Sequence, residues 1–336
     1  MSLCEHLQAA GHGVVVACKS RSPLAPAMKE LGLDVRELGI SGKANLLAPF
    51  RVAALARRVG AAVIHSHLST AALHSSLAGR FAGLPTVAHV RALNTAHAYR
   101  LASRVIAVSR AVKEHLVSQG MDAGGIDVVY NGVDPARYYL PMTREEARCK
   151  LGLPEGPLVG VVAHLTAKKG HAVFLEAFAS IAGKHPGAAA LFLGDGEERE
   201  SLRAQAKRFT LSDRLIFAGF QPDVLPYYAA MDLVVLPSIE GEGLPRALLE
   251  GGLLRRPAIG TRISGVPEII REGETGFIVP VGDAPALAEQ LDILLSDGVL
   301  RTAMGDAAHD YVATNFTVEA MVRGVLETYR KAEAAF

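Results

Sequence analysis

Short apolar runs alternate with longer segments of helical periodicity along most of the chain. In the first part, the apolar runs predict strands at Gly13–Cys18, Ala62–His65, Thr86–His89, Val105–Val108 and Ile126–Val129. The segments between them predict helices at Leu47–Val59, Thr70–Phe81 and Arg110–Gln119. Alternation of this kind indicates a parallel sheet with right-handed helical crossovers.

A second series of alternating elements follows a stretch at Pro135–Pro157, where prolines and polar residues interrupt the pattern and predict a linker. Its predicted strands are Leu158–Ala163, Ala188–Leu193, Arg214–Ala218, Leu233–Leu236 and Ala258–Thr261. Its predicted helices are Val173–Ala182, Glu198–Phe209, Val224–Ala230, Pro245–Leu254 and Val266–Glu272, and a last helix is expected at Thr317–Ala334. The pattern predicts an α/β protein with two doubly wound domains facing a cleft, at residues 1–140 and 155–312. Ligands are expected beyond the carboxyl ends of the strands.

Composition and length agree with two globular domains. The chain has 336 residues, half of them hydrophobic and about a fifth charged. Cys4, Cys18 and Cys149 have no metal-ligand spacing and no even count, which fits a reducing compartment. Neither a secretory signal nor a run of about twenty apolar residues is present, so a cytoplasmic location is expected.

The charges are unevenly distributed along the chain. Residues 1–136 contain fourteen Lys and Arg against eight Asp and Glu, a balance of +6, and the remainder carries −5. A basic first half predicts contact with an anionic membrane surface or a phosphorylated acceptor, or is simply a solvated face. Helix-turn-helix patterns, zinc spacing and aromatic–basic interleaving are absent from the sequence, which argues against nucleic acid.

The most informative segment is SIEGEGLPRALLEGG, at Ser238–Gly252. A buried strand precedes it, and a helix is expected to open at Pro245, where a missing N–H costs nothing. A loop that leads into a helix N-terminus offers free backbone N–H groups and the positive end of a dipole to an anion such as a phosphate. A carboxylate at Glu250 suits the paired hydroxyls of a ribose, and Glu242 on the loop suits those of a second sugar. Two ordinary surface glutamates are the alternative.

Glu242 and Glu250, with seven residues between them, resemble the acidic pair of the retaining GT-B-fold glycosyltransferases that use nucleotide-sugars, the glycosyl transferases group 1. Lys169 in VVAHLTAKKGH is similar to that family's basic motif, with His164 where the family has an arginine. His89 in VAHVRALNT resembles the family histidine that faces the donor sugar. The resemblance therefore implies that His89, Lys169 and Glu242 are catalytic.

Further positions follow the family's order along nearly the whole chain, and the resemblance implies that a C-terminal helix at residues 313–336 returns to the first domain. Asp195, in the run Gly-Asp-Gly at a predicted strand end, resembles the turn under the nucleotide. Phe220, at the next strand end, lies where the family holds the base. Gly243 and Leu244 precede the helix N-terminus and belong to the expected nucleotide-sugar site. A tight turn and a surface aromatic are the structural alternatives for Asp195 and Phe220.

The resemblance implies transfer of a sugar, with retention, from a nucleoside-diphosphate sugar, most simply a UDP-sugar. A glycan or lipid-linked acceptor in bacterial cell-surface polysaccharide or lipopolysaccharide assembly is expected, with the protein peripheral at the inner face of the membrane. Charge stabilisation is assigned to Lys169, the helix N-terminus at Leu244–Pro245 and His164. The sequence has no Asp-x-Asp pair at a loop, so no metal or other cofactor is expected. The alternatives are a catalytically silent partner subunit of the same fold and a sugar-nucleotide epimerase.

Two features of the first half stand apart. The chain opens directly on a predicted helix, MSLCEHLQAAGHG, whereas in the family a strand and a glycine-rich loop precede that helix, so a truncated start is expected. His65 and His67 alternate at a strand end and therefore share one face. They are interpreted as structural, as polar groups on the acceptor side, or as two metal ligands for which the sequence offers no evident third.

Overall fold

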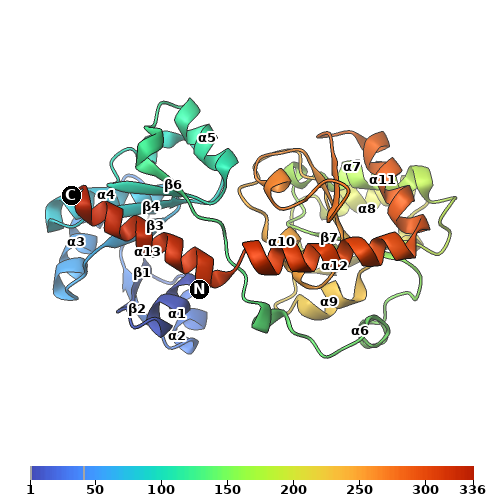
Figure 1. Ribbon diagram of the computed structural model, residues 1–336, viewed down its shortest axis with the longest axis horizontal. Coiled ribbons are helices and arrows are strands. Elements are labelled where there is room, and N and C mark those ends of the chain that lie inside the picture. The colour runs from blue at the N-terminus through green and yellow to red at the C-terminus, as the bar shows by residue number, and fades with distance from the viewer. Residues whose placement is uncertain (1, 41) are drawn as a thin grey trace. The chain divides into compact units, whose positions relative to one another are not determined.

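The computed structural model describes residues 2–40 and 42–336, and the chain divides into two compact units (Figure 1). Unit 1 comprises Met1–Gly132 and Val318–Phe336, and unit 2 comprises Val133–Thr317. The division comes earlier than the boundary at residue 140 suggested by the sequence. The reason is that Val133 donates a hydrogen bond to the Phe316 carbonyl at 2.8 Å and pairs with Thr317.

Unit 1 contains two parallel sheets. β1 (Val15–Lys19) pairs with β2 (Asp34–Leu38), and four further strands pair in chain order: β3 (Ile64–His67), β4 (Thr86–Val90), β5 (Arg104–Ala107) and β6 (Ile126–Val128). The helices of the N-terminal segment are α1 (Ser2–Ala9), α2 (Ala25–Glu30), α3 (Ala48–Arg58), α4 (Ser69–Ala82) and α5 (Arg110–Ser118). β4 is buried along its whole length, which fits a strand with paired neighbours on both sides.

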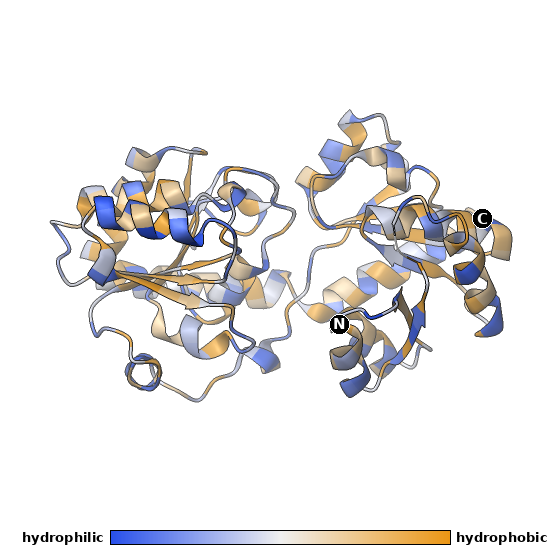
Figure 2. Cartoon of the chain, turned by 180° about the vertical axis from the view of Figure 1, so that it is seen from behind, coloured by the Kyte–Doolittle hydropathy of each residue, from blue (hydrophilic) through white to orange (hydrophobic). Residues whose placement is uncertain are grey.

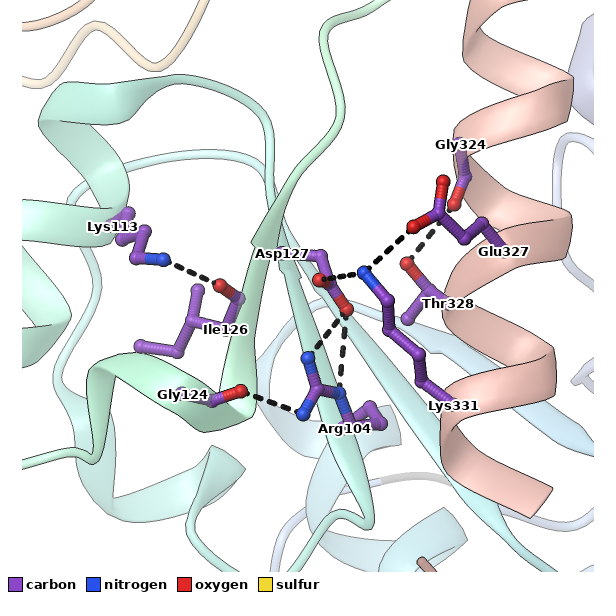
Figure 3. Close-up of polar contacts among 9 residues, drawn as sticks. All are labelled: Arg104, Lys113, Gly124, Ile126, Asp127, Gly324, Glu327, Thr328 and Lys331. Atoms are coloured by element: carbon purple, nitrogen blue, oxygen red, sulfur yellow. Dashed lines mark hydrogen bonds and ion pairs between the residues drawn. The ribbon is translucent and has the colours of Figure 1, made fainter. Parts of the chain in front are cut away.

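The C-terminal helix α13 (Val318–Ala334) completes unit 1. Its buried apolar face, which includes Met321 and Val325, packs against side chains of β4, β5 and the segment after β6. Figure 3 shows Asp127 of β6 between Arg104 and Lys331, with its oxygens 2.8 Å and 2.9 Å from the two cations. Burial raises the pKa of Asp127, but the hydrogen bonds from both cations outweigh it and lower the pKa below its ordinary value. This charged network thus fixes α13 to strands that lie far before it in sequence.

Unit 2 is built on a parallel sheet of six strands in the order β12-β11-β10-β7-β8-β9. The strands are β7 (Leu158–Val162), β8 (Ala189–Leu193), β9 (Leu215–Gly219), β10 (Leu233–Leu236), β11 (Ala258–Thr261) and β12 (Gly276–Val279). The helices are α6 (Arg144–Leu151), α7 (His171–Ile181), α8 (Arg199–Arg208), α9 (Leu225–Ala230), α10 (Arg246–Leu253), α11 (Ala284–Ser296) and α12 (Gly298–Asn315). The chain winds from β7 to one edge, then returns to β10 and winds to the other edge. The switch point therefore lies between the adjacent strands β7 and β10.

The strands of unit 2 form its apolar centre, visible as orange arrows in Figure 2. Every residue of β8, β10 and β11 is buried, because helices cover both faces of a parallel sheet. Among the described residues, no helix combines the length and the apolar character that crossing a bilayer requires.

Two predictions of secondary structure were wrong. The linker expected at Pro135–Pro157 contains α6, whose N-terminus has a full capping box between Thr143 and Glu146. The helix expected at Val266–Glu272 is a short 3-10 turn that ends at Glu268. The turn does not continue as a helix, because the Arg271 N–H donates to the Thr275 hydroxyl oxygen at 2.9 Å instead of to a helical carbonyl.

Candidate active site

The two loops at the switch point of unit 2 bring Lys169 and Glu242 together. Lys169 ends the 3-10 turn after β7, and Glu242 lies in the loop between β10 and α10. Lys169 Nζ donates to Glu242 Oε1 at 2.6 Å, and Ser238 Oγ donates to the same oxygen at 2.5 Å. Glu242 is only 5% exposed. This carboxylate is therefore buried, paired and held at the carboxyl end of the sheet, where a doubly wound fold binds its ligands.

Gly170 sets how closely these loops approach. Its φ of +67° is a left-handed conformation, and a Cβ there would lie 1.9 Å from the Pro237 carbonyl oxygen. The Ile239 N–H also donates to the Lys168 carbonyl at 2.8 Å. A tight backbone contact thus places Lys169 beside the acidic loop.

Glu250 lies on α10 in a separate cluster of hydrogen-bond donors. Its Oε1 accepts from the Tyr138 hydroxyl at 2.9 Å and from Arg246 at 3.0 Å and 3.1 Å, and its Oε2 accepts from the Tyr228 hydroxyl at 3.2 Å. Burial and the nearby carboxylate raise the pKa of Tyr138 to about 12 and that of Tyr228 well above its usual range. Both hydroxyls therefore stay protonated and keep donating to Glu250.

The N-terminus of α10 lies between the two glutamates in sequence. Gly243 and Leu244 are both buried, and the helix begins at Arg246 with Pro245 as the N-cap residue. No side chain in the described part of the chain caps this terminus. Its first-turn N–H groups and the end of the helix dipole suit an anionic group.

His164, Asp195 and Phe220 lie at the neighbouring strand ends of β7, β8 and β9. His164 Nδ1 is 3.4 Å from the Asp195 carbonyl oxygen. The Asp195 carboxylate accepts from the Gly196 N–H at 2.9 Å and from Arg199 at 3.0 Å, and these contacts lower its pKa. Phe220 is 74% exposed directly after β9. The Asp195 turn is thus held by its own contacts, while the Phe220 ring is free to stack with a planar group.

In unit 1, His89 lies on β4 and is 1% exposed. It pairs in register with His67 of β3, and its Nδ1 is 3.3 Å from His65 Nε2. The sequence shows no evident third metal ligand beside His65 and His67. In the structure, His89 of the adjacent strand is the third histidine of the cluster. Parallel strands end at the same edge of a sheet, so the positions of these residues near two strand ends were a signal for this cluster.

Sequence reasoning missed four residues that hold the two glutamates. Arg246 precedes Glu250 by one helical turn, so helical spacing could have identified it. Ser238 lies at the start of the acidic loop, close in sequence to Glu242. Tyr138 and Tyr228 had no local signal, because they reach Glu250 from η3 (Pro135–Tyr138) and α9.

Comparison with known proteins connects these residues to a family. The family model described as Glycosyl transferases group 1 matches residues 143–311, and the one described as Glycosyltransferase Family 4 matches residues 1–137. The lipopolysaccharide core biosynthesis glycosyltransferase LpsE of Rhizobium meliloti (strain 1021) is 34% identical over 181 residues, which are 54% of this chain and 52% of LpsE. The chain spans about half the length of the curated relatives that it matches first.

Two solved structures resemble the whole fold. A glycosyltransferase from Rickettsia africae ESF-5 gives a TM-score of 0.90 at 23% identity, covering 98% of this chain and 93% of that one. HepE of Anabaena in complex with UDP-glucose gives 0.87 at 23% identity, covering 97% and 94%. These likenesses confirm the predicted GT-B fold. The group 1 model covers half of the chain and includes Lys169, Glu242 and Glu250, and the protein accordingly belongs to the glycosyl transferases group 1 family.

Proposed function

We propose that this protein is a retaining glycosyltransferase that moves a sugar from a nucleoside-diphosphate sugar, a UDP-sugar, to an acceptor hydroxyl. The observation that carries the proposal is the pairing of Lys169 with the buried Glu242 at the switch point of unit 2, one loop before the helix that holds Glu250. Family membership and the likeness to HepE, which was solved with UDP-glucose, support the choice of donor.

Unit 2 is the donor side in this proposal. Glu250 binds the ribose hydroxyls, and the exposed Phe220 ring stacks on the base. The uncapped first turn of α10 binds the diphosphate, with Lys169 as the nearby cation. Glu242 accepts hydrogen bonds from hydroxyls of the transferred sugar. Each role uses a chemical property of the residue in its observed position.

The proposed reaction breaks the bond between the anomeric carbon and the diphosphate oxygen, and the electron pair leaves with the diphosphate. The acceptor oxygen forms the new bond on the same face, and its proton passes to the leaving phosphate. This front-face path is inferred from the resemblance to the family. Lys169 and the helix terminus stabilise the negative charge that develops on the leaving group. Because Lys169 already contacts Glu242, a small movement of its side chain can exchange a carboxylate for a phosphate oxygen.

We infer that the acceptor is a glycan or lipid-linked molecule of bacterial cell-surface polysaccharide or lipopolysaccharide assembly, as the name of LpsE suggests. Unit 1 carries a surface suited to the inner face of an anionic membrane. Leu46 and Leu47 directly before α3 are 84% and 59% exposed, and Phe50 within α3 is 55% exposed and stacks on Phe81 of α4, with ring centroids 4.6 Å apart. Residues 38–113 include ten Lys and Arg and no acidic residue. Exposed apolar side chains within a basic segment are typical of an interfacial site.

Calorimetry with UDP, GDP and ADP, each with and without EDTA, tests the donor site. UDP is expected to bind in the presence of EDTA, since Lys169 and the helix terminus supply the positive charge. An absolute requirement for Mg²⁺, or binding of none of the three nucleotides, contradicts the proposal. Transfer from UDP-glucose is then measured by release of UDP.

Sedimentation with vesicles tests the membrane contact. The protein is expected to bind vesicles of phosphatidylglycerol and not of phosphatidylcholine, and Phe50→Ser should weaken that binding. Val299→Ser is the matched control, because Val299 is 82% exposed but lies in unit 2 outside the basic segment. Equal loss of binding in both variants, or equal binding to both lipids, contradicts the assigned surface.

A further inference from the structure

Three histidines of unit 1 bring their ring nitrogens to one place. His65 and His67 lie on the same face of β3, and His89 pairs in register with His67 from β4. One nitrogen from each ring lies within 4.8 Å of the other two. Two histidines on one strand and a third on its neighbour thus form a set of three imidazole ligands, a donor set that suits a transition-metal ion.

The distances between the rings are close to those that a shared ion requires. His65 Nε2 is 3.3 Å from His89 Nδ1, and a tetrahedral zinc ion with bonds of about 2.0–2.1 Å separates two nitrogen ligands by about 3.4 Å. The three ring centroids lie 4.7 Å, 5.0 Å and 5.4 Å apart. The planes of His65 and His67 are 24° apart, so the His67 ring must turn to direct a lone pair at the same position. The χ2 torsion of histidine is broad, and that rotation therefore costs little.

Two of the rings have a nitrogen without a partner. His67 Nδ1 and His89 Nε2 are buried and have no hydrogen-bond partner among the residues that the structure describes. His89 is only 1% exposed. Native proteins rarely bury a polar atom without a partner, and each exception calls for an explanation such as an ion. The cluster is therefore incomplete without a ligand.

Tyr329 of α13 lies beside the third ring. Its hydroxyl oxygen is 2.6 Å from His65 Nδ1. A histidine that binds a metal through one nitrogen almost always donates its other N–H to an oxygen, which fixes the orientation of the ring. The Tyr329 oxygen is in place to accept from Nδ1–H while His65 Nε2 faces His89.

The histidines are neutral at pH 7. Burial is the main cause, and it lowers the pKa of His67 to about 4 and the pKa values of His65 and His89 well below their ordinary range. The positive charge of Arg91 acts in the same direction. A metal ion therefore meets little competition from protons. The same Arg91 charge opposes a divalent cation, so a moderate affinity is expected.

We propose that His65, His67 and His89 bind one divalent transition-metal ion, most simply Zn²⁺, with Tyr329 as the hydrogen-bond partner that orients His65. Three protein ligands leave the fourth tetrahedral position to a water molecule. The ion links β3 to β4 and, through Tyr329, α13 to this sheet, all within unit 1. It is separate from the donor loops of unit 2, for which the sequence predicts no metal.

Calorimetric titration of the full chain with Zn²⁺, after treatment with EDTA and its removal, tests the site. The wild type is expected to bind one ion per chain and to melt at a higher temperature with Zn²⁺ than without it. His67→Gln should weaken binding by at least about 100-fold, because loss of an outer hydrogen-bond partner alone typically costs about ten- to 100-fold. His74→Gln is the matched control and should bind like the wild type. His74 is a buried histidine of the same unit, and its Nε2 lies 2.9 Å from the Gly42 carbonyl oxygen, outside the cluster.

Tyr329→Phe isolates the outer hydrogen bond. It keeps all three imidazoles and is expected to weaken Zn²⁺ binding by about ten- to 100-fold. Tyr311→Phe, which removes a tyrosine hydrogen bond to the Glu268 carbonyl in unit 2, should leave the affinity unchanged. Equal affinity in the wild type and Tyr329→Phe contradicts the role assigned to Tyr329.

X-ray absorption at the zinc edge identifies the ligands of the one-to-one complex without any substitution, so this measurement does not depend on how well a variant folds. Three imidazole nitrogens at about 2.0–2.1 Å are expected. The inference is overturned by a lack of saturable binding at one ion per chain, by unchanged affinity in His67→Gln, or by sulfur ligation from Cys4 or Cys18. UDP binding and sugar transfer are measured separately, so a failure of the proposed donor site leaves this result unaffected.

Discussion

The sharpest test of the donor site is Glu250→Gln. This change removes the negative charge and replaces one of two accepting oxygens with an NH₂ group. In the structure Oε1 accepts from Tyr138 and Arg246 and Oε2 accepts from Tyr228, so the amide must face at least one donor. The buried Tyr228 hydroxyl also lies 3.2 Å from the Ala247 carbonyl oxygen and so keeps an acceptor, and the loss of hydrogen bonds to a charged Glu250 is expected to cost about 1–3 kcal/mol of stability. A ribose bound to the carboxylate loses about 1.5–3 kcal/mol on the same change, or roughly 10- to 150-fold in Kd for UDP.

Two assays separate these effects. Calorimetry measures the Kd for UDP well below the melting temperature, and thermal unfolding measures the loss of stability. Glu240→Gln is the matched control, because Glu240 lies in the same loop, is 62% exposed and, in the described part of the chain, forms its ion pair with the exposed Lys168. It should change neither quantity appreciably. If Glu250→Gln lowers the melting temperature but binds UDP within twofold of the wild type, Glu250 has a structural role and its assignment to the ribose is wrong.

Four further outcomes are expected. Gly170→Ala should destabilise unit 2 by about 2–4 kcal/mol in urea unfolding, since its Cβ would lie 1.9 Å from the Pro237 carbonyl oxygen; little change would mean that the loops are not in tight contact. Lys169→Met leaves Glu242 buried without its cation and should cost about 3 kcal/mol; adding Glu242→Gln should recover most of this stability but no transfer activity, and recovered activity would contradict both assigned roles. His67 has its pKa lowered to about 4 in the folded state, so the folded protein disfavours the charged ring. Its stabilisation is complete above about pH 6.5 and is lost as the pH falls toward 4, and a urea series should show a weaker pH dependence in His67→Gln. In hydrogen exchange, the two-stranded β1–β2 sheet should exchange faster than β3–β6, because an isolated strand pair is marginally stable, and equal protection would contradict this.

The buried strands were the most predictable part of the fold. The runs at Leu233–Leu236 and Ala258–Thr261 match β10 and β11 residue for residue, because strands buried on both faces are continuous apolar segments. β2 was missed since it carries Asp34, Arg36 and Glu37 on a largely exposed strand, and its short sequence has little apolar signal. β12, at the edge of the larger sheet, and the helices α11 and α12 were also missed.

The candidate site was predictable to the extent that local sequence determines it. Lys169 and Glu242 follow buried strands by short loops, and neighbouring parallel strands bring such loops together. The hydroxyls around Glu250 depend on tertiary packing, because Tyr138 is 112 residues away in sequence. The hydrogen bond between the Tyr329 hydroxyl and His65 joins residues 264 apart in sequence, and no local pattern predicts it.

The packing of α13 on β4 and β5 has a consequence for the order in which the protein forms during synthesis. The helix that covers this sheet and supplies Lys331 to Asp127 follows the whole of unit 2 in sequence, although the strands that it covers precede unit 2. At 5–20 residues per second, roughly 10–40 s separate the emergence of β6 from that of α13. All residues of unit 2 lie between these two elements in sequence and therefore leave the ribosome before α13 does. The apolar side chains of Val87 and Ile106, which α13 covers in the folded unit, therefore lack this cover for that time during synthesis.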